Sequence, residues 1–217
     1  MIVVLDYGMG NVGSILNMLK KIGQKGVASA DARLIEAADG IILPGVGAFD
    51  EGMERLERLD LVPLLNRQAL ELRKPILGIC LGMQLLTRRS DEGRKPGLSW
   101  VDAETVRFFR NHERAPQRVP HMGWNTVTAS SAHALFDGIE DPRYYFVHSY
   151  HVECKNPDNV LATADYGGRF TAALMRDNIL GTQFHPEKSH SFGLRLIENF
   201  VKRVCHVQIP SYSLPAA

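Results

Sequence analysis

The chain has 217 residues, of which 45% are hydrophobic and 23% charged, so it has the balance of a folded globular protein and enough length for one large core. Its 25 Lys and Arg against 24 Asp and Glu leave a net charge of +1, which excludes a strong overall field that would attract nucleic acid. The apolar runs are far shorter than the roughly 20 residues of a membrane-spanning helix, and the N-terminal run lacks the basic region of a signal peptide.

The first half of the chain alternates short apolar runs with amphipathic segments. The apolar runs at 2–5, 27–30, 40–43 and 75–79 predict strands, and helical spacing of apolar residues predicts helices at about 15–22, 53–59, 64–72 and 80–87. Strands that are apolar throughout and separated by helices are typical of a parallel sheet with helices on both faces.

The second half begins with a polar loop at 90–97 and then predicts several strands without long helices between them. These strands are expected at 104–109, 125–128, 144–148, 161–164, 170–175 and 179–184, and a last helix is expected at about 191–204. The predicted fold class is therefore α/β, with a mostly parallel twisted sheet, helices on both faces and added antiparallel strands. We expect one domain over residues 1–204 and a poorly ordered tail over 205–217, where prolines and small residues gather.

The segment 8–13, GMGNVG, fits the dinucleotide-binding pattern GxGxxG, since it follows a strand, opens a helix and precedes Asp31 by about 20 residues. Asp6 opposes this interpretation, because a carboxylate beside a pyrophosphate would repel it. A tight strand-to-helix turn that uses the conformational freedom of glycine explains the same residues. NAD(P) binding stays open as an alternative from a different functional class.

A stronger signal is the G-x-C-x-G pattern of 78–82, which lies after an apolar strand and before a helix. This is the thiol form of a nucleophile elbow, in which a sharp turn raises the nucleophile above the carboxyl ends of the strands. The positive end of the helix favours the thiolate of Cys80. The backbone N–H of Leu81 is placed to face a developing oxyanion.

A thiol nucleophile needs a base, and His185 is the first candidate because Glu187 follows it across Pro186. In extended chain, residues two apart point the same way, so the carboxylate would hold the imidazole. His151 with Glu153 is the runner-up. Three further histidines are rivals that more often serve structural or surface roles: His121, His148 and His190. A metal site at His185, Glu187 and His190 matches no strong ligand spacing, so no metal is expected.

The turn at 43–49 follows the third predicted strand and carries two glycines around Val46. Its N–H groups would supply the second half of an oxyanion hole near Val46 and Gly47, and a plain turn is the alternative.

The three cysteines are far apart and contain no CxxC pair, which argues against a disulfide framework and a zinc site. We expect Cys154 and Cys205 to be ordinary buried thiols. We therefore expect a reducing, cytoplasmic compartment.

The segments 78–84 (GICLGMQ) and 183–187 (QFHPE) together resemble the class I glutamine amidotransferases and their Cys-His-Glu triad. Other segments are similar to the glutaminase subunits of imidazole glycerol phosphate synthases, which belong to histidine biosynthesis; these are 6–11, 43–49, 120–125 and 145–150. The likeness runs from residue 1 to about 204.

The resemblance implies that Cys80 attacks the side-chain amide of glutamine and forms a thioester, with His185 carrying protons and Glu187 orienting it. It implies no cofactor. It also implies that Gln84 and the backbone near Gly47, Ser149 and Tyr150 hold the glutamine.

The resemblance further implies a heterodimer with a TIM-barrel cyclase that receives the ammonia, because free ammonia at neutral pH is mostly protonated. Trp124 suits this interface, although a buried core Trp fits the sequence equally well. Asn11 and Lys188 are the other interface candidates. We expect the isolated chain to be nearly silent, with the 45–47 turn as the switch.

Overall fold

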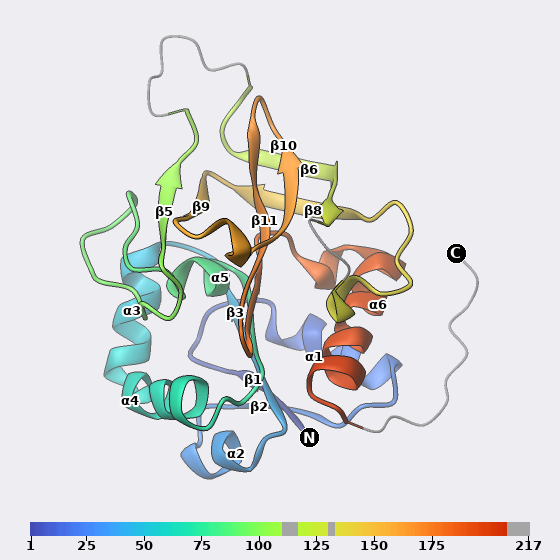
Figure 1. The fold of residues 1–217 in the computed structure, drawn as a ribbon. Helices are drawn as coiled ribbons and strands as arrows, with labels where there is room; N and C mark the ends of the chain where they lie inside the picture. The colour runs from blue at the N-terminus through green and yellow to red at the C-terminus, as the bar shows by residue number, and fades with distance from the viewer. Residues whose placement is uncertain (110–116, 130–132, 208–217) are drawn as a thin grey trace.

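The computed structural model describes residues 1–109, 117–129 and 133–207 (Figure 1). The helices are α1 (Val12–Lys21), α2 (Ala32–Ala37), α3 (Phe49–Arg58), α4 (Leu61–Asn66), α5 (Leu81–Leu85) and α6 (His190–Asn199). The strands are β1 (Ile2–Leu5), β2 (Gly26–Ser29), β3 (Gly40–Gly45), β4 (Ile76–Cys80), β5 (Ala103–Arg107), β6 (His121–Thr126), β7 (Thr128–Ala129), β8 (Arg143–His148), β9 (Tyr150–Cys154), β10 (Val160–Asp165), β11 (Arg169–Arg176) and β12 (Ile179–Thr182). Two π-helical segments, Arg67–Glu71 and Phe200–Val204, continue α4 and α6.

One large sheet carries the fold, with the order β2-β1-β3-β4-β12-β11-β10-β7. Its strands from β2 to β12 pair in parallel, and those from β12 onward pair antiparallel. Strand β9 joins β11 and also pairs with β5, and a separate ribbon is formed by β6 and β8. This confirms the predicted mostly parallel sheet with antiparallel strands added late in the chain.

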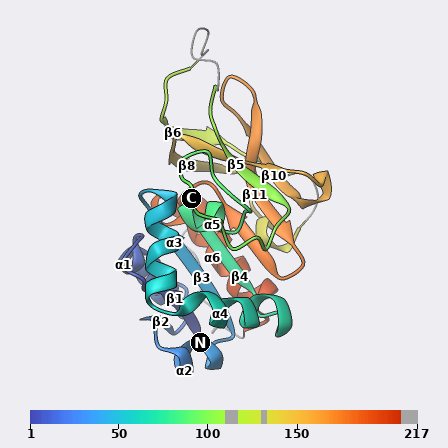
Figure 2. The same cartoon turned by 90° about the vertical axis from the view of Figure 1, so that its left-hand side faces the viewer.

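Two hydrophobic cores lie on the two faces of the parallel strands. Helices α1 and α6 cover one face, where Ile15 and Leu196 pack with Ile42. Helices α3, α4 and α5 cover the other, where Phe49 and Leu65 pack with apolar residues of the intervening strands. Figures 1 and 2 show this layering, with the antiparallel strands forming an upper part above the parallel strands. Residue alternation in each buried strand therefore serves two cores, which explains why the strands are apolar throughout.

The strand order places three strand ends side by side. Gly45 at the end of β3 is the register partner of Cys80 at the end of β4, and Thr182 at the end of β12 is the partner of Ile79. All three strands run parallel, so their carboxyl ends open on the same edge. Ligands of open α/β sheets bind at this edge.

The structure corrects several predicted boundaries. The strand expected at 125–128 begins earlier, as β6 at His121, because its pattern is inverted: the buried positions hold polar His121 and the exposed positions hold Met122 and Trp124. The strand expected at 179–184 ends at Thr182. Helix α2 and strand β9 were not predicted, since each buries one apolar residue fully, Ile35 and Val152 respectively.

The expected poorly ordered tail, 205–217, lies outside the described residues from 208 onward. Within the described ranges, the structure contains no helix long and apolar enough to cross a bilayer.

Candidate active site

Cys80 occupies the sharp turn between β4 and α5. Its backbone has φ 54° and ψ −110°, a conformation that non-glycine residues adopt at a cost of about 1–3 kcal/mol. Its side chain is 7% exposed and reaches a cavity. The strained, nearly buried thiol has the geometry of the predicted nucleophile elbow.

The glycines around the elbow allow backbone segments to touch. A Cβ on Gly82 would lie 1.9 Å from the Leu43 carbonyl oxygen, and a Cβ on Gly78 would lie 2.7 Å from the Gly82 carbonyl oxygen. Both distances are below any real contact, so only glycine fits at either position. The G-x-C-x-G pattern is thus a packing requirement of β3, β4 and α5.

His185 and Glu187 follow β12 and form a buried pair. The side chains are 1% and 2% exposed, and the His185 Nδ1–H donates to Glu187 Oε1 at 2.7 Å. The backbone N–H of His185 donates to the Tyr145 carbonyl at 2.9 Å, which fixes the turn. Among the described residues, His185 Nε2 makes no hydrogen bond of ordinary geometry, but it lies near enough to the Cys80 sulfur for the two to interact electrostatically.

The charges of the site favour an imidazolium at His185, which lies between the Glu187 carboxylate and the Cys80 sulfur. Burial alone would lower the pKa of His185, but the Cys80 sulfur and the Glu187 carboxylate outweigh it and raise that pKa. Burial would likewise raise the pKa of Glu187, but the hydrogen bond and charge of His185 hold it below its usual range. The Gln183 Nε2 donates to the Cys80 sulfur at 3.7 Å, which further suits a thiolate.

Asn11 connects the N-terminal glycine segment to this pair. Its Nδ2 donates to Glu187 Oε1 at 2.7 Å. Gly10 has φ 98° and lies against Pro44, where a Cβ would come within 2.7 Å of the proline ring. Gly8 has φ 83°, and its carbonyl accepts a hydrogen bond from Arg55. These contacts account for the two glycines without a dinucleotide.

A cavity of about 380 Å³ lies over Cys80 and His185. All the residues predicted to hold glutamine or its oxyanion line this cavity: Val46, Gly47, Leu81, Gln84, Ser149 and Tyr150. They come from the turn after β3, from α5 and from the β8–β9 junction. The fold therefore brings together, around the Cys80 thiol, residues that are up to 104 positions apart in the chain.

The cavity has further polar lining residues that the sequence interpretation did not place there, Glu92 and His148. Glu92 accepts a hydrogen bond from the Phe49 N–H at 2.8 Å, and burial raises the pKa of its carboxyl. Residues 90–97 were predicted only as a polar loop. No local spacing links a loop carboxylate to a distant thiol, so tertiary contact is the only signal for Glu92.

The rival histidines have other surroundings. His151 packs on Phe108 with ring centroids 4.6 Å apart, and neither it nor Glu153 is among the described residues that line the Cys80 cavity. His190 stacks on Trp124 at 5.4 Å. His121 is buried on the inner face of β6, against His148. The three cysteines are free, and Cys154 and Cys205 are partly buried.

Two of the interface candidates share one surface beside the triad. Trp124 is 43% exposed, and Met122, two residues before it on β6, is 61% exposed. Trp124 is therefore not a buried core residue, which was the alternative to an interface residue. Lys188 is exposed and holds its Nζ 5.8 Å from the centre of the Tyr145 ring. Asn11 is half-buried, with its amide turned to Glu187.

Comparison with known proteins places this geometry in context. The glutamine amidotransferase class-I family model matches residues 3–204. The chain is 53% identical to imidazole glycerol phosphate synthase subunit HisH 2 of Pseudomonas aeruginosa over 205 residues, which covers 94% of this chain and all of that protein. It is 51% identical to the subunit HisH 2 of Methanococcus maripaludis over 204 residues, with 94% and 100% coverage.

Solved structures share the fold at lower identity. A crystal structure of a glutamine amidotransferase aligns with a TM-score of 0.74 at 18% identity, covering 95% of this chain and 99% of that one. A glutamine amidotransferase from Thermotoga maritima aligns with a TM-score of 0.59 at 18% identity, covering 94% of this chain and 83% of that one.

Proposed function

The chain belongs to the class I glutamine amidotransferases and, within them, to the HisH family of imidazole glycerol phosphate synthase subunits, and from this premise we propose how its residues divide the work. Cys80 is the nucleophile, His185 the proton carrier and Glu187 the group that orients His185. The observation that carries this assignment is the buried His185–Glu187 pair beside the strained thiol.

The reaction begins with attack of the Cys80 thiolate on the side-chain carboxamide carbon of L-glutamine. The carbonyl oxygen becomes an oxyanion, which the Leu81 N–H faces from the start of α5. The imidazolium of His185 gives its proton to the departing nitrogen, so ammonia leaves and a γ-glutamyl thioester remains. Water then adds to the thioester with His185 as base, and glutamate and the free thiol are released.

The glutamine is held by the lining of the cavity over Cys80. Both protons of Gln84 Nε2 go to protein acceptors, the Tyr150 carbonyl at 3.2 Å and Gln183 Oε1 at 3.1 Å. Gln84 therefore has its Oε1 to offer the substrate, which suits an N–H donor. The carboxylate of Glu92 suits the substrate α-ammonium group.

The ammonia is passed to a cyclase subunit that forms imidazole glycerol phosphate and an aminoimidazole carboxamide ribotide. We infer that this cyclase is a TIM barrel and that it docks on the surface formed by Met122, Trp124 and Lys188. We place the complex in the cytoplasm. Direct transfer matters because ammonia released into water at neutral pH is protonated and loses its nucleophilicity. Exposed Met and Trp side chains beside a cation are typical of a protein interface.

The test is a Cys80→Ala chain assembled with its cyclase partner. Glutamine-dependent synthesis should be lost, while synthesis from added ammonia should stay at the wild-type rate, because Cys80 acts only in releasing ammonia. Loss of both activities would mean that Cys80 supports the fold or the interface instead. A glutamine-mimicking electrophile should label Cys80, and labelling at Cys154 or Cys205 would overturn the assignment.

A further inference from the structure

Two buried histidines connect the inner face of β6 with the cavity over Cys80. His121 of β6 and His148 of β8 are register partners in the antiparallel ribbon and are 3% and 6% exposed. The Nδ1 of His121 and the Nε2 of His148 are 3.0 Å apart. His148 lines the cavity over Cys80, but neither histidine belongs to the Cys80–His185–Glu187 triad.

The hydrogen-bond partners determine the tautomer of both rings. His148 Nδ1 is 2.7 Å from the Tyr150 carbonyl oxygen, which only accepts, so Nδ1 carries the proton. In a neutral ring the Nε2 of His148 is then an acceptor, and His121 Nδ1 must be its donor. The remaining nitrogen of His121, Nε2, is an acceptor and lies 3.3 Å from the Asn125 amide nitrogen. All the hydrogen bonds thus run in one direction, from Asn125 to the Tyr150 carbonyl.

The far end of this chain of hydrogen bonds is part of the substrate cavity. The Tyr150 carbonyl accepts from His148 and also from Gln84 Nε2. Gln84 also donates to Gln183, which in turn donates to the Cys80 sulfur. The Tyr150 carbonyl oxygen is therefore one of the two acceptors that orient Gln84 in the cavity.

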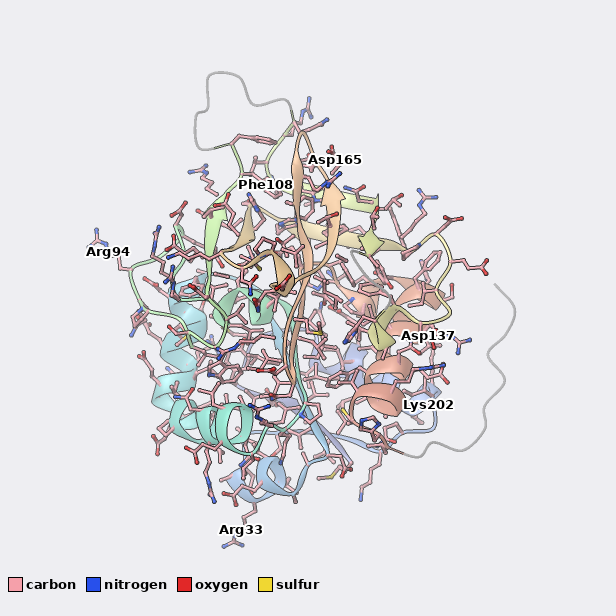
Figure 3. All side chains as sticks on the ribbon, in the orientation of Figure 1. Arg33, Arg94, Phe108, Asp137, Asp165 and Lys202 are labelled. Carbon is pink, nitrogen blue, oxygen red and sulfur yellow. The ribbon has the colours of Figure 1, made fainter. Side chains whose placement is uncertain are left out.

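The near end is anchored by aromatic rings. The ring of His121 stacks between Phe146 at 4.8 Å and Tyr166 at 4.0 Å, and Phe108 closes the cluster against His148 at 5.1 Å. Asn125 also donates to the Asp165 carbonyl at 2.8 Å. Figure 3 shows Phe108 and Asp165 in the upper part of the molecule, beside the antiparallel strands. Burial lowers the pKa of His121 to about 4 and that of His148 well below its usual value, so both rings are neutral at pH 7.

Strand β6 turns one face toward the interior, where the cavity over Cys80 lies, and the other toward the proposed docking surface. His121 and Asn125 point inward, whereas Met122 and Trp124 lie on the exposed face. We propose that His121 and His148 are positioning residues that connect the docking face of β6 to the Tyr150 carbonyl, and through it to Gln84 and the bound glutamine. This inference rests on the proposed function, because it assigns the exposed face of β6 to the cyclase partner.

The experiment compares two substitutions at one position, in the complex with the cyclase. His121→Phe keeps the ring that stacks on Phe146 and Tyr166 but removes the donor to His148. His121→Asn removes the ring but places an amide N–H about where Nδ1 lies. We expect His121→Phe to raise the KM for glutamine roughly 3- to 10-fold, the effect of losing one hydrogen bond, with a smaller change in kcat. His121→Asn should stay within about 2-fold of the wild-type KM, and ammonia-dependent synthesis should be unchanged in both.

A merely structural role for His121 predicts the opposite order, with the Asn variant more impaired than the Phe variant, and that result would overturn the proposal. Equal KM values for wild type and His121→Phe would overturn it as well. Nitrogen-15 NMR of the histidine rings in the free chain tests the hydrogen-bond chain without any partner or activity. We expect both rings to be neutral at pH 7 with the proton on Nδ1. A proton on Nε2 of either ring would contradict the chain of hydrogen bonds on which the proposal depends. A wild-type complex without glutamine-dependent synthesis would instead contradict the proposed function.

Discussion

At Glu187, one carboxylate oxygen accepts two hydrogen bonds, from the His185 ring and from the Asn11 amide, both at 2.7 Å. The carboxylate is thereby fixed in place and kept ionised in a buried site, where an unpaired charge would be costly. Its charge stabilises the imidazolium of His185, which lies beside the Cys80 sulfur. The protonation of His185 therefore depends on a carboxylate that is not among the described residues lining the cavity over Cys80.

We predict that Glu187→Gln lowers the glutaminase rate of the complex by about 10²-fold, within the usual contribution of a positioned acid or base. The alkaline limb of the pH profile of kcat/KM should also move to lower pH. The reason is that Glu187 raises the pKa of His185, so removing its charge lets the imidazolium lose its proton earlier as the pH rises. Glu153→Gln, beside the rival His151 and exposed, is the matched control and should leave the profile in place. An unshifted alkaline limb in Glu187→Gln would contradict the assignment of Glu187.

Glu92 leads to a prediction about substrate affinity. Glu92→Gln should raise the KM for glutamine about 10- to 100-fold with little change in kcat, because a hydrogen bond to a charged group is lost while the acceptor for the Phe49 N–H remains. Burial raises the pKa of Glu92, so on acidification its carboxylate is protonated at a higher pH than that of an ordinary glutamate. The wild-type KM should therefore begin to rise at this higher pH. The Glu92→Gln variant should lack this pH dependence. Glu54→Gln, on the exposed side of α3, serves as the control. An unchanged KM in Glu92→Gln would remove Glu92 from the glutamine site.

Among the elements, the turn between β4 and α5 depends on contact with β3. Strand β3 passes so close that the Leu43 carbonyl occupies the space where a Gly82 side chain would lie. The same close approach brings Gly45 into register with Cys80, which places Val46 and Gly47 beside the thiol. Packing of two neighbouring strands and one short helix thus builds both sides of the proposed oxyanion site.

We predict that Gly82→Ala destabilises the protein by at least about 3 kcal/mol, the upper range for overpacking, because the clash is with backbone that has no flexible end to move. Gly13→Ala provides the contrast, since a Cβ there meets nothing within 4 Å and the residue lies in the exposed first turn of α1. It should stabilise the chain by about 0.5–1 kcal/mol through helix propensity. Urea unfolding of both variants measures the difference. Similar midpoints for the two variants would mean that β3 yields to a larger residue at the elbow.

For the whole molecule, the candidate active site and the proposed docking surface lie side by side, so we propose that docking at one controls the other. The Tyr7 hydroxyl donates to the Pro44 carbonyl at 2.7 Å, so the residue before the 45–47 turn is held in place. Rotation is left to the peptides on either side of Val46, which is 39% exposed, and Gly47 beyond it has φ 103°. Partner docking is proposed to favour the orientation in which a second N–H faces the oxyanion.

We predict that the isolated chain hydrolyses glutamine about 10²–10³-fold more slowly than the complex with cyclase and acceptor analogue, the usual effect of one missing oxyanion donor. The assay compares the free chain, the chain with its partner, and the chain with partner and analogue. Trp124→Ala should require more partner to reach the same activation, because it removes the largest exposed ring of the docking surface. A free chain that turns over as fast as the full complex would contradict the switch.

Local patterns in the sequence were enough to predict the parallel half of the sheet, the elbow at Cys80 and the pairing of His185 with Glu187. Each of these depends on residues that are neighbours along the chain: an apolar run, two glycines around a thiol, and a carboxylate two residues beyond a histidine. Burial and close backbone approach act over a few residues, and so does the His185–Glu187 pairing, although Pro186–Lys188 form a 3-10 helical turn and not the extended chain that was expected. They can therefore be inferred before the fold is known.

Only the tertiary structure decided which distant groups surround the thiol and which face of β6 is buried. The Asn11 amide reaches Glu187 across 176 positions, and Glu92 enters the cavity from a loop without a distinguishing pattern. The sequence predicted strand β6 at the wrong residues, because its inward residues, His121 and Asn125, are polar and its outward residues, Met122 and Trp124, are apolar. A buried hydrogen-bond chain and an exposed docking face reverse the usual alternation, and partners supplied by other strands make that reversal stable.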